Sequence, residues 1–569
     1  MDDNERFKIT SNEYADLIVE NDHPIVEGIP YSINRINNQY STIFIPVSNF
    51  TYNSVFKYSY EAIPKCFGLL SSGNMGMEEI TSMIRALEVQ PLHGEGVLIG
   101  IIDTGIDYTN PLFLDGNKST RITSIWDQTI ESGRYPNELY YGTEYSRDEI
   151  NNALSNENPH SIVPSIDEIG HGTMLAGIAG GYDPNNRDFS GVATLSEFAV
   201  VKLKPAKSYL KEFFCIPESA VCYQENDIMM AITYLQRVAN NLKRPMVICL
   251  GIGSSQGPHL GLCVICDYLM QVNEAIGRSV VVGAGNEGES GHHFFGEVNH
   301  DIGYQIAELN VGPNEYGFSM ELWGDSPSIF GVEIIGPDGT FIVRIPATIL
   351  KQDTLRLEYG ETVIYVDNEV RVPRVGDSFI LLRFCNPKEG VWQLRIFEEG
   401  FINMKFHIWL PIEKFTSTET HFLIPNSYTT LSMPANVEWI FAVVAYNPID
   451  FSLYTVSSKG FTKANLVKPN VGAPGMNIYA PSIEGTFINA SGTGIAAAYA
   501  AGTVALLLEW GIVRGNYTEM SGIDVNRFLI RGAFRDPNLT YPNEDWGYGI
   551  LDLENSLKLA ALSVPLERF

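Results

Sequence analysis

Three polar side chains lie beside apolar or glycine-rich runs in a pattern that suits acyl-transfer chemistry. Asp103 ends the run VLIGIID, His171 lies between glycines in GHGTMLAGIAGG, and Asn286 follows VVVGAG. A carboxylate can orient an imidazole, an imidazole can act as a general base, and an amide can donate to a developing oxyanion. Apolar strands that alternate with helices build open sheets whose sites lie at the carboxyl ends of the strands. We therefore expect these three residues to belong to one site.

Structural roles remain open for each residue taken alone. An Asp or Asn in a turn is common without any chemistry, and a histidine is more often packed or exposed than a base. His171 differs because a helix that begins with small residues lets its ring project into a cleft. We assign no role to seven other histidines: His160, His259, His292, His293, His300, His407 and His421.

A fourth segment, ASGTGIAAAYAAGTVALLLEW, follows the other three along the chain. The segments DTGID, HGT…GIAGG, GAGNEG and SGTGIAAAYAAG together resemble the subtilase family of serine proteases, over roughly residues 75 to 300 and 435 to 560. The resemblance implies that Asp103 orients the histidine, His171 is the general base and Asn286 is the oxyanion donor. It also places the nucleophile at position 494, where this chain has Gly494.

A glycine at position 494 removes the nucleophile, because it has no side-chain oxygen with which to form an acyl-enzyme. Ser491 and Thr493 lie beside it, but each backbone step turns a side chain away from the histidine, so we expect neither to replace the missing serine. The resemblance also places the substrate groove at residues Gly251, Ile252 and Gly253. We expect this small, flexible strand edge to weaken the pairing of a peptide.

The long N-terminal unit, the β insertion and the ending PNEDWGYGILDL resemble the Csp germination subtilases of clostridial spores, most closely the pseudoprotease CspC type. This implies an inactive regulator in the spore cortex or outer forespore region. Such a regulator would sense a small-molecule germinant, or bind another Csp-type protease or the precursor of a cortex hydrolase. The alternatives are an active serine endopeptidase with an altered nucleophile, and a structural spore protein. Neither a cofactor nor a metal is expected.

The missing serine has a consequence for processing. A subtilase prodomain is released by the enzyme's own serine, so residues 1 to about 70 should here remain covalently attached. The end of this unit would then lie along the substrate groove.

The elements that must position these residues fall into four zones. Near-continuous apolar strands alternating with helices predict an α/β fold, a subtilisin-like parallel sheet with helices on both faces. Short alternating segments split by Gly, Pro, Asn and Asp predict an inserted all-β jelly roll. The predicted boundaries are 1–72 for an α+β prodomain, 73–302 and 433–569 for the subtilase domain, and 303–432 for the jelly roll. The segment SSGNMGMEEI is expected to be an exposed connector.

Composition excludes some functions. The 569 residues carry a net charge of −29, which argues against nucleic acid or anionic lipid as a partner. The N-terminus lacks the features of a secretory signal, and we expect no transmembrane segment, since the most apolar stretch is interrupted by glycine. Seven scattered cysteines suggest free thiols. Cys263 and Cys266 form a CxxC that could bind zinc or act as a redox pair, but a helical pattern around them favours buried thiols.

Overall fold

The computed structural model describes residues 2–22, 31–74, 92–186, 188–299, 301–346, 354–369, 372, 374–398 and 404–563. Its centre is an eight-stranded sheet with the strand order β26-β25-β13-β11-β6-β9-β7-β8. The strands are β6 (Leu98–Asp103), β7 (Ile122–Asp127), β8 (Thr143–Ser146), β9 (Glu197–Lys202), β11 (Met246–Leu250), β13 (Arg278–Gly283), β25 (Phe441–Tyr446) and β26 (Val471–Pro474). All neighbouring pairs are parallel except β7 with β8, which forms an antiparallel edge.

Helices cover both faces of this sheet, as the near-continuous apolar strands predict. On one face α4 (His171–Gly180) and α8 (Thr493–Leu508) pack together in a common apolar core. On the other face lie α6 (Glu225–Leu242) and α7 (Val264–Glu274). The remaining helices of this part are α3 (Arg147–Leu154), α5 (Ser208–Phe213), α9 (Gly522–Gly532) and α10 (Leu553–Ser563). The predicted α/β class is confirmed.

Helix α8 and its continuation to Val513 also bear on the membrane question. The 21 residues Thr493–Val513 have the length and apolar composition of a membrane span, with a mean hydropathy of 1.6. In this structure 83% of the apolar window is buried. The stretch is therefore the central core helix of the sheet domain. A helix buried in a protein core requires the same apolar composition as a membrane span.

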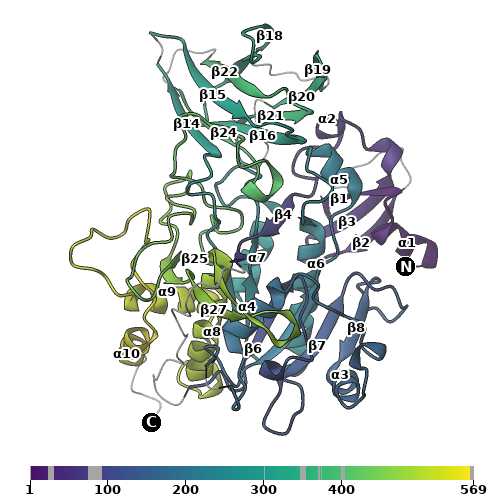
Figure 1. Ribbon diagram of the computed structural model, residues 1–569, viewed down its shortest axis with the longest axis vertical. Coiled ribbons are helices and arrows are strands. Elements are labelled where there is room, and N and C mark those ends of the chain that lie inside the picture. The colour runs from purple at the N-terminus through teal and green to yellow at the C-terminus, as the bar shows by residue number, and fades with distance from the viewer. Residues whose placement is uncertain are drawn as a thin grey trace.

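Two antiparallel sheets enclose a separate apolar core at the top of Figure 1. One has the order β14-β23-β16-β21-β20-β19 and the other β18-β17-β22-β15-β24. Their strands are β14 (His293–Val298), β15 (Tyr304–Val311), β16 (Gly317–Gly324), β17 (Phe330–Ile335), β18 (Phe341–Ile345), β19 (Leu355–Tyr359), β20 (Thr362–Glu369), β21 (Ser378–Cys385), β22 (Gly390–Glu398), β23 (Met404–Trp409) and β24 (His421–Phe422). The inserted β domain is thus present, with strands where the short alternating segments predict them.

The N-terminal unit is a three-stranded antiparallel sheet with the order β1-β3-β2 and two helices, drawn in purple in Figure 1. Its elements are α1 (Asp3–Thr10), β1 (Tyr14–Glu20), β2 (Ser32–Arg35), β3 (Tyr40–Pro46) and α2 (Ser54–Tyr58). The chain then leaves the unit and enters the main domain as a short extended segment, residues 66–74, which we call the tail.

The tail overlaps the segment that was predicted to be an exposed connector. Its first strand, β4 (Cys66–Leu69), pairs on one side with β10 (Tyr223–Gln224) and on the other with β12 (Ile252–Gly253). Its second strand, β5 (Ser72–Asn74), pairs with β28 (Phe487–Ser491), which also pairs with β27 (Ile478–Pro481). The predicted connector SSGNMGMEEI therefore begins as paired strand, because pairing satisfies its backbone groups. Residues 75–80 of that connector lie outside the described residues.

The CxxC motif is a second correction. Cys263 and Cys266 form a disulfide instead of the expected pair of thiols, with their Cα atoms 4.9 Å apart. Cys263 is the N-cap of α7, and the first helical turn brings Cys266 back toward it. Cys66, Cys215, Cys222, Cys249 and Cys385 are free, as predicted.

Candidate active site

Asp103 and His171 meet at the carboxyl end of the central strand β6. Asp103 is the last residue of β6 and is fully buried, and its Oδ1 lies 2.7 Å from His171 Nδ1. The same oxygen accepts a hydrogen bond of 2.7 Å from the Thr104 backbone N–H. The carboxylate therefore fixes the proton of the imidazole on Nδ1 and leaves Nε2 as an acceptor.

His171 is held in place by the start of its helix. It is the first residue of α4, and the next backbone N–H, that of Gly172, donates to Thr104 Oγ1 at 2.9 Å. A side chain at Gly172 would collide with the Gly105 carbonyl, so the close approach of α4 to the strand end requires glycine there. The glycine-rich sequence around His171 thus sets the ring against β6, as the sequence indicates.

The tail faces the other nitrogen of the imidazole. Ser71 Oγ donates a hydrogen bond to His171 Nε2, and Ser71 is only 6% exposed. One residue earlier, the Leu70 N–H donates to the Gly251 carbonyl at 2.8 Å, and the Leu70 carbonyl accepts from the Gly494 N–H at 2.9 Å. The peptide bond between Leu70 and Ser71 therefore lies across the site, with its carbonyl oxygen bound to the start of α8.

Gly494 places a backbone donor, and no side chain, against this carbonyl. A Cβ built at Gly494 would lie 3.4 Å from the Leu70 carbonyl carbon and 3.2 Å from its oxygen. The backbone at Gly494 does not have the left-handed φ that would favour glycine. A side chain at this position would thus begin beside the carbon that a nucleophile must attack, at the cost of shifting its neighbours by a few tenths of an ångström.

Asn286 lies beside the same helix start. Its Oδ1 accepts from the Thr493 backbone N–H and from Thr493 Oγ1, both at 3.1 Å. Thr493 Oγ1 also accepts from the Gly285 N–H at 3.1 Å. These bonds engage the amide oxygen, so any hydrogen bond that this side chain gives to an oxyanion has to come from Nδ2.

Residues Gly251, Ile252 and Gly253 form the strand edge on which the tail lies. Leu69 pairs with Ile252 and Gly68 with Gly253 in antiparallel register. A Cβ at Gly253 would lie 3.0 Å from Leu70 Cδ1, so glycine makes room for the Leu70 side chain. The end of the N-terminal unit thus lies along the groove, as predicted. That this small edge weakens the pairing of an external peptide stays a prediction.

A buried polar network docks the N-terminal unit on the main domain. Asp16 of β1 is fully buried and forms an ion pair with Lys207. Its other oxygen accepts from Gln224 Nε2 at 2.7 Å and from Asn226 Nδ2 at 3.2 Å. Burial lowers the pKa of Lys207, and Asp16 opposes that effect. An unpaired charge at this interface would be costly, so the network favours a unit that stays in place.

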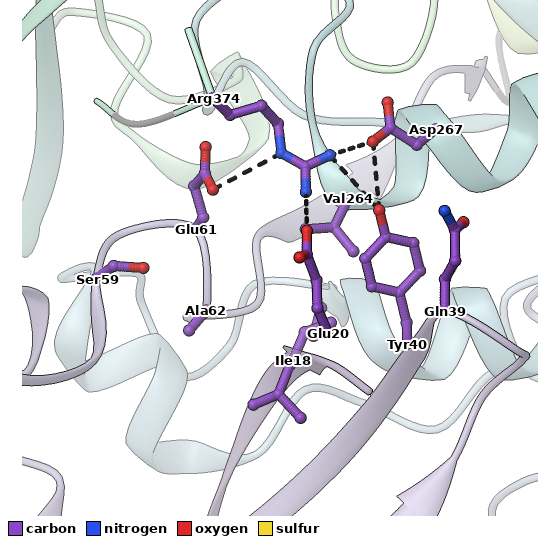
Figure 2. Close-up of a pocket in the computed structure, with 11 residues that line it drawn as sticks. Ile18, Glu20, Gln39, Tyr40, Ser59, Glu61, Ala62, Val264, Asp267 and Arg374 are labelled. Carbon is purple, nitrogen blue, oxygen red and sulfur yellow. Dashed lines mark hydrogen bonds and ion pairs between the residues drawn. The ribbon is translucent and has the colours of Figure 1, made fainter. Parts of the chain in front are cut away.

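Arg374, from the inserted β domain, joins all three parts of the chain (Figure 2). Its guanidinium lies 2.7 Å from Glu20 and 3.7 Å from Glu61 of the N-terminal unit, and it contacts Asp267 of α7. Tyr40 accepts from the same guanidinium at 3.5 Å. These groups line an open cavity of about 570 Å³. This ion-pair network fixes the N-terminal unit against both neighbours.

The sequence did not indicate that Ser71 belongs to the site. The structure brings together Asp103, His171, Asn286 and Gly494 with the groove residues, but the side chain that contacts the imidazole comes from the tail. The only local signal is a serine directly after the apolar run CFGLL. Nothing in that run indicates that the serine after it contacts the imidazole.

The fold agrees with the comparisons to known proteins. The chain matches the subtilase family (Peptidase S8) over residues 94–307 and 419–549. These stretches make up more than half of the 569 residues. The chain therefore belongs to the subtilase family. The unmatched stretch between them corresponds to most of the antiparallel sheets.

A solved structure extends the likeness beyond these two stretches. The chain is similar to the CspB protease of Clostridium perfringens, with 32% sequence identity and a TM-score of 0.74 over 83% of this chain and 94% of that one.

Curated proteins add more distant relatives. The PII-type proteinase of Lacticaseibacillus paracasei is 23% identical over 485 residues, and the PI-type proteinase of Lactococcus lactis subsp. cremoris is 22% identical over 482 residues. Each match takes in 77% of this chain but only 24% of the relative, so the chain spans about a quarter of their length.

Proposed function

We propose that this chain is a catalytically inactive subtilase that regulates spore germination by binding and not by turnover. One observation carries the proposal: position 494 presents only a backbone N–H to the carbonyl in the groove, at 2.9 Å, and has no hydroxyl to attack it. In a serine protease, loss of the nucleophile removes about six orders of magnitude of kcat. The occupied groove adds to this, because an external peptide must first displace the tail.

The family likeness supports a choice of setting and binding partner. We propose that the chain acts in the spore, in the cortex or outer forespore region. There it senses a small-molecule germinant, or controls an active Csp-type protease that activates the precursor of a cortex hydrolase. The similarity to CspB supports this setting.

An active endopeptidase with an altered nucleophile is the second candidate. The observation that favours it is the intact geometry around the missing hydroxyl, with the Asp103–His171 contact at 2.7 Å and the Gly494 N–H directed at a carbonyl. Such an enzyme would cleave an external peptide as the native chain, with Gly494 in place.

Turnover and germination are tested separately. The purified full chain is incubated with fluorogenic peptides that carry Leu before the scissile bond, as at Leu70, and no turnover above buffer is expected. Turnover that disappears in the His171→Ala variant would refute the inactive assignment.

In spores that lack the gene, we expect loss of germination and its recovery with either the native chain or Gly494→Ala, which adds a methyl but no hydroxyl. Normal germination without the gene would refute the regulatory role.

A further inference from the structure

The tail serine lies where a chemical step could occur without the missing nucleophile. Ser71 Oγ donates to His171 Nε2, and His171 Nδ1 is 2.7 Å from Asp103. The carbonyl before Ser71 is bound by the Gly494 N–H at 2.9 Å. A hydroxyl, a base, the residue that orients the base and an oxyanion donor therefore converge on one peptide bond.

We propose that Ser71 is the nucleophile for a single self-cleavage of the Leu70–Ser71 bond, through an N-to-O acyl shift with His171 as the base. This goes beyond the proposed function, which concerns the turnover of other chains. It also replaces the expectation that residues 1 to about 70 stay covalently attached: they would stay bound, but as a separate fragment.

The first step moves the acyl group from nitrogen to oxygen. His171 Nε2 takes the proton of Ser71 Oγ, and the oxygen bonds to the Leu70 carbonyl carbon, closing a five-membered ring. The negative charge that forms on the Leu70 oxygen is stabilised by the Gly494 N–H. The bond between this carbon and the Ser71 nitrogen then breaks, and the nitrogen takes the proton from His171. The product is an ester between Leu70 and Ser71 Oγ with a free amine on Ser71.

The second step is hydrolysis of the ester. His171 takes a proton from one water, the resulting hydroxide attacks the ester carbonyl, and the Ser71 oxygen leaves with that proton. One water is consumed and one peptide bond is broken, so His171 ends as it began and no oxidant or reductant is needed.

Three features of the site favour the first step, the acyl shift. The attacking oxygen and the carbonyl belong to adjacent residues, so no second molecule has to be positioned. The Leu70 N–H bond to Gly251 and the pairing of Ser72–Asn74 with β28 hold the backbone on both sides of the bond. Burial of Ser71 keeps bulk water from competing for the base.

The other nearby hydroxyls have different partners. Ser491 Oγ accepts from the Asn477 N–H at 3.0 Å. Thr493 Oγ1 donates to Asn286 and accepts from Gly285. Ser71 is thus the hydroxyl that these contacts assign to His171.

Cleavage would occur once for each chain. The strands on both sides of the bond remain paired with β10, β12 and β28, and the Asp16 network keeps the N-terminal unit docked. The new carboxylate would stay in the groove and block external peptides.

The test uses the full chain purified from a host without subtilase relatives and followed by denaturing mass spectrometry, with and without hydroxylamine. Hydroxylamine attacks esters, so we expect faster cleavage, a fragment ending in a Leu70 hydroxamate, and a second fragment beginning at Ser71. The rate should not depend on protein concentration, because the step is intramolecular.

Variants separate this step from trace proteolysis. Ser71→Ala should abolish the hydroxylamine-dependent cleavage, Ser71→Cys should retain it through the thiol, and His171→Ala should slow it by about 10²- to 10⁴-fold. Ser491→Ala is the matched control and should cleave like the native chain.

A folded native chain that stays intact in hydroxylamine, or a Ser71→Ala chain that is cut equally fast, would overturn the proposal. The proposed function fails on a different measurement, the turnover of an external peptide, so the two failures can be told apart.

Discussion

Replacing Gly494 with serine is expected to restore rapid cutting of the chain's own tail. The Cβ of a side chain at this position lies 3.4 Å from the Leu70 carbonyl carbon, and the Gly494 N–H already binds the carbonyl oxygen. The new hydroxyl would therefore extend from a point next to the reacting carbon. Because Ser71 is itself a proposed nucleophile, the comparison is made in chains that carry Ser71→Ala.

The expected gain is large. Removing the serine of subtilisin costs about 2 × 10⁶ in kcat, which corresponds to about 8 to 9 kcal/mol of transition-state stabilisation. The tight fit of the Cβ against the Leu70 oxygen, at 3.2 Å, will reduce this gain if the tail backbone has to shift. Even a tenth of this rate factor, about 2 × 10⁵, would separate cleavage during expression from cleavage too slow to detect.

The assay is denaturing electrophoresis with N-terminal sequencing of the larger fragment, which should begin at residue 71. Gly494→Ala is the matched control, because it adds the Cβ without the hydroxyl and should leave the tail uncut. Adding His171→Ala to Gly494→Ser should remove most of the gain. A folded Gly494→Ser chain that stays uncut would refute the view that one missing oxygen separates this site from a working one. Cutting of the Gly494→Ala control would refute the assignment of position 494 to the nucleophile.

Three further predictions concern stability and thiol chemistry. Asp16→Ala should lower the free energy of unfolding by about 3 to 5 kcal/mol in urea titrations, because it leaves Lys207 buried without its partner. Burial lowers the pKa of His259 to about 4 and that of His293 to about 3, below the usual 6.5. The unfolded chain therefore binds more protons below pH 6.5, and thermal scans should show stability falling from there toward pH 4, by about 1.4 kcal/mol per pH unit for each histidine. Alkylation without reductant, read by mass spectrometry, should leave Cys263 and Cys266 unmodified and label both after reduction.

Each of these has a clear contrary result. If Asp16→Ala has the same free energy of unfolding as the native chain, the buried ion pair does not stabilise the fold. Equal stability at pH 6.5 and pH 4 would mean that the two imidazoles are hydrated in solution. Labelling of Cys263 and Cys266 without reductant would restore the original expectation of free thiols at the CxxC.

Much of the fold could be predicted because its signals are local. The apolar run ending at Asp103 forms the strand β6, and the glycine-rich segment starting at His171 forms the helix α4, as their patterns indicate. The short alternating segments after residue 303 form antiparallel strands. In each case the burial of side chains on one element is visible in the spacing of its own residues.

The CxxC and the connector SSGNMGMEEI were predicted incorrectly for a common reason. The helical pattern over Val264–Glu274 is correct, but whether two thiols at its start become a disulfide depends on the cap geometry of Cys263. Likewise, the polar and glycine-rich composition of SSGNMG suits a connector, and only its partners make it a strand. Pairing with segments far along the chain overrides local composition.

The sequence by itself determined what each position of the site can do chemically: a carboxylate at Asp103, an imidazole at His171, an amide at Asn286 and no hydroxyl at Gly494. The tertiary structure decided which peptide bond lies among them. The tail reaches His171 because it pairs with residues 223–224, 252–253 and 489–491, which are separated from it by more than 140 positions. Register between such distant strands is set by the assembled sheet and the docked N-terminal unit, so only the folded chain brings the Ser71 hydroxyl to the base that the missing serine would have used.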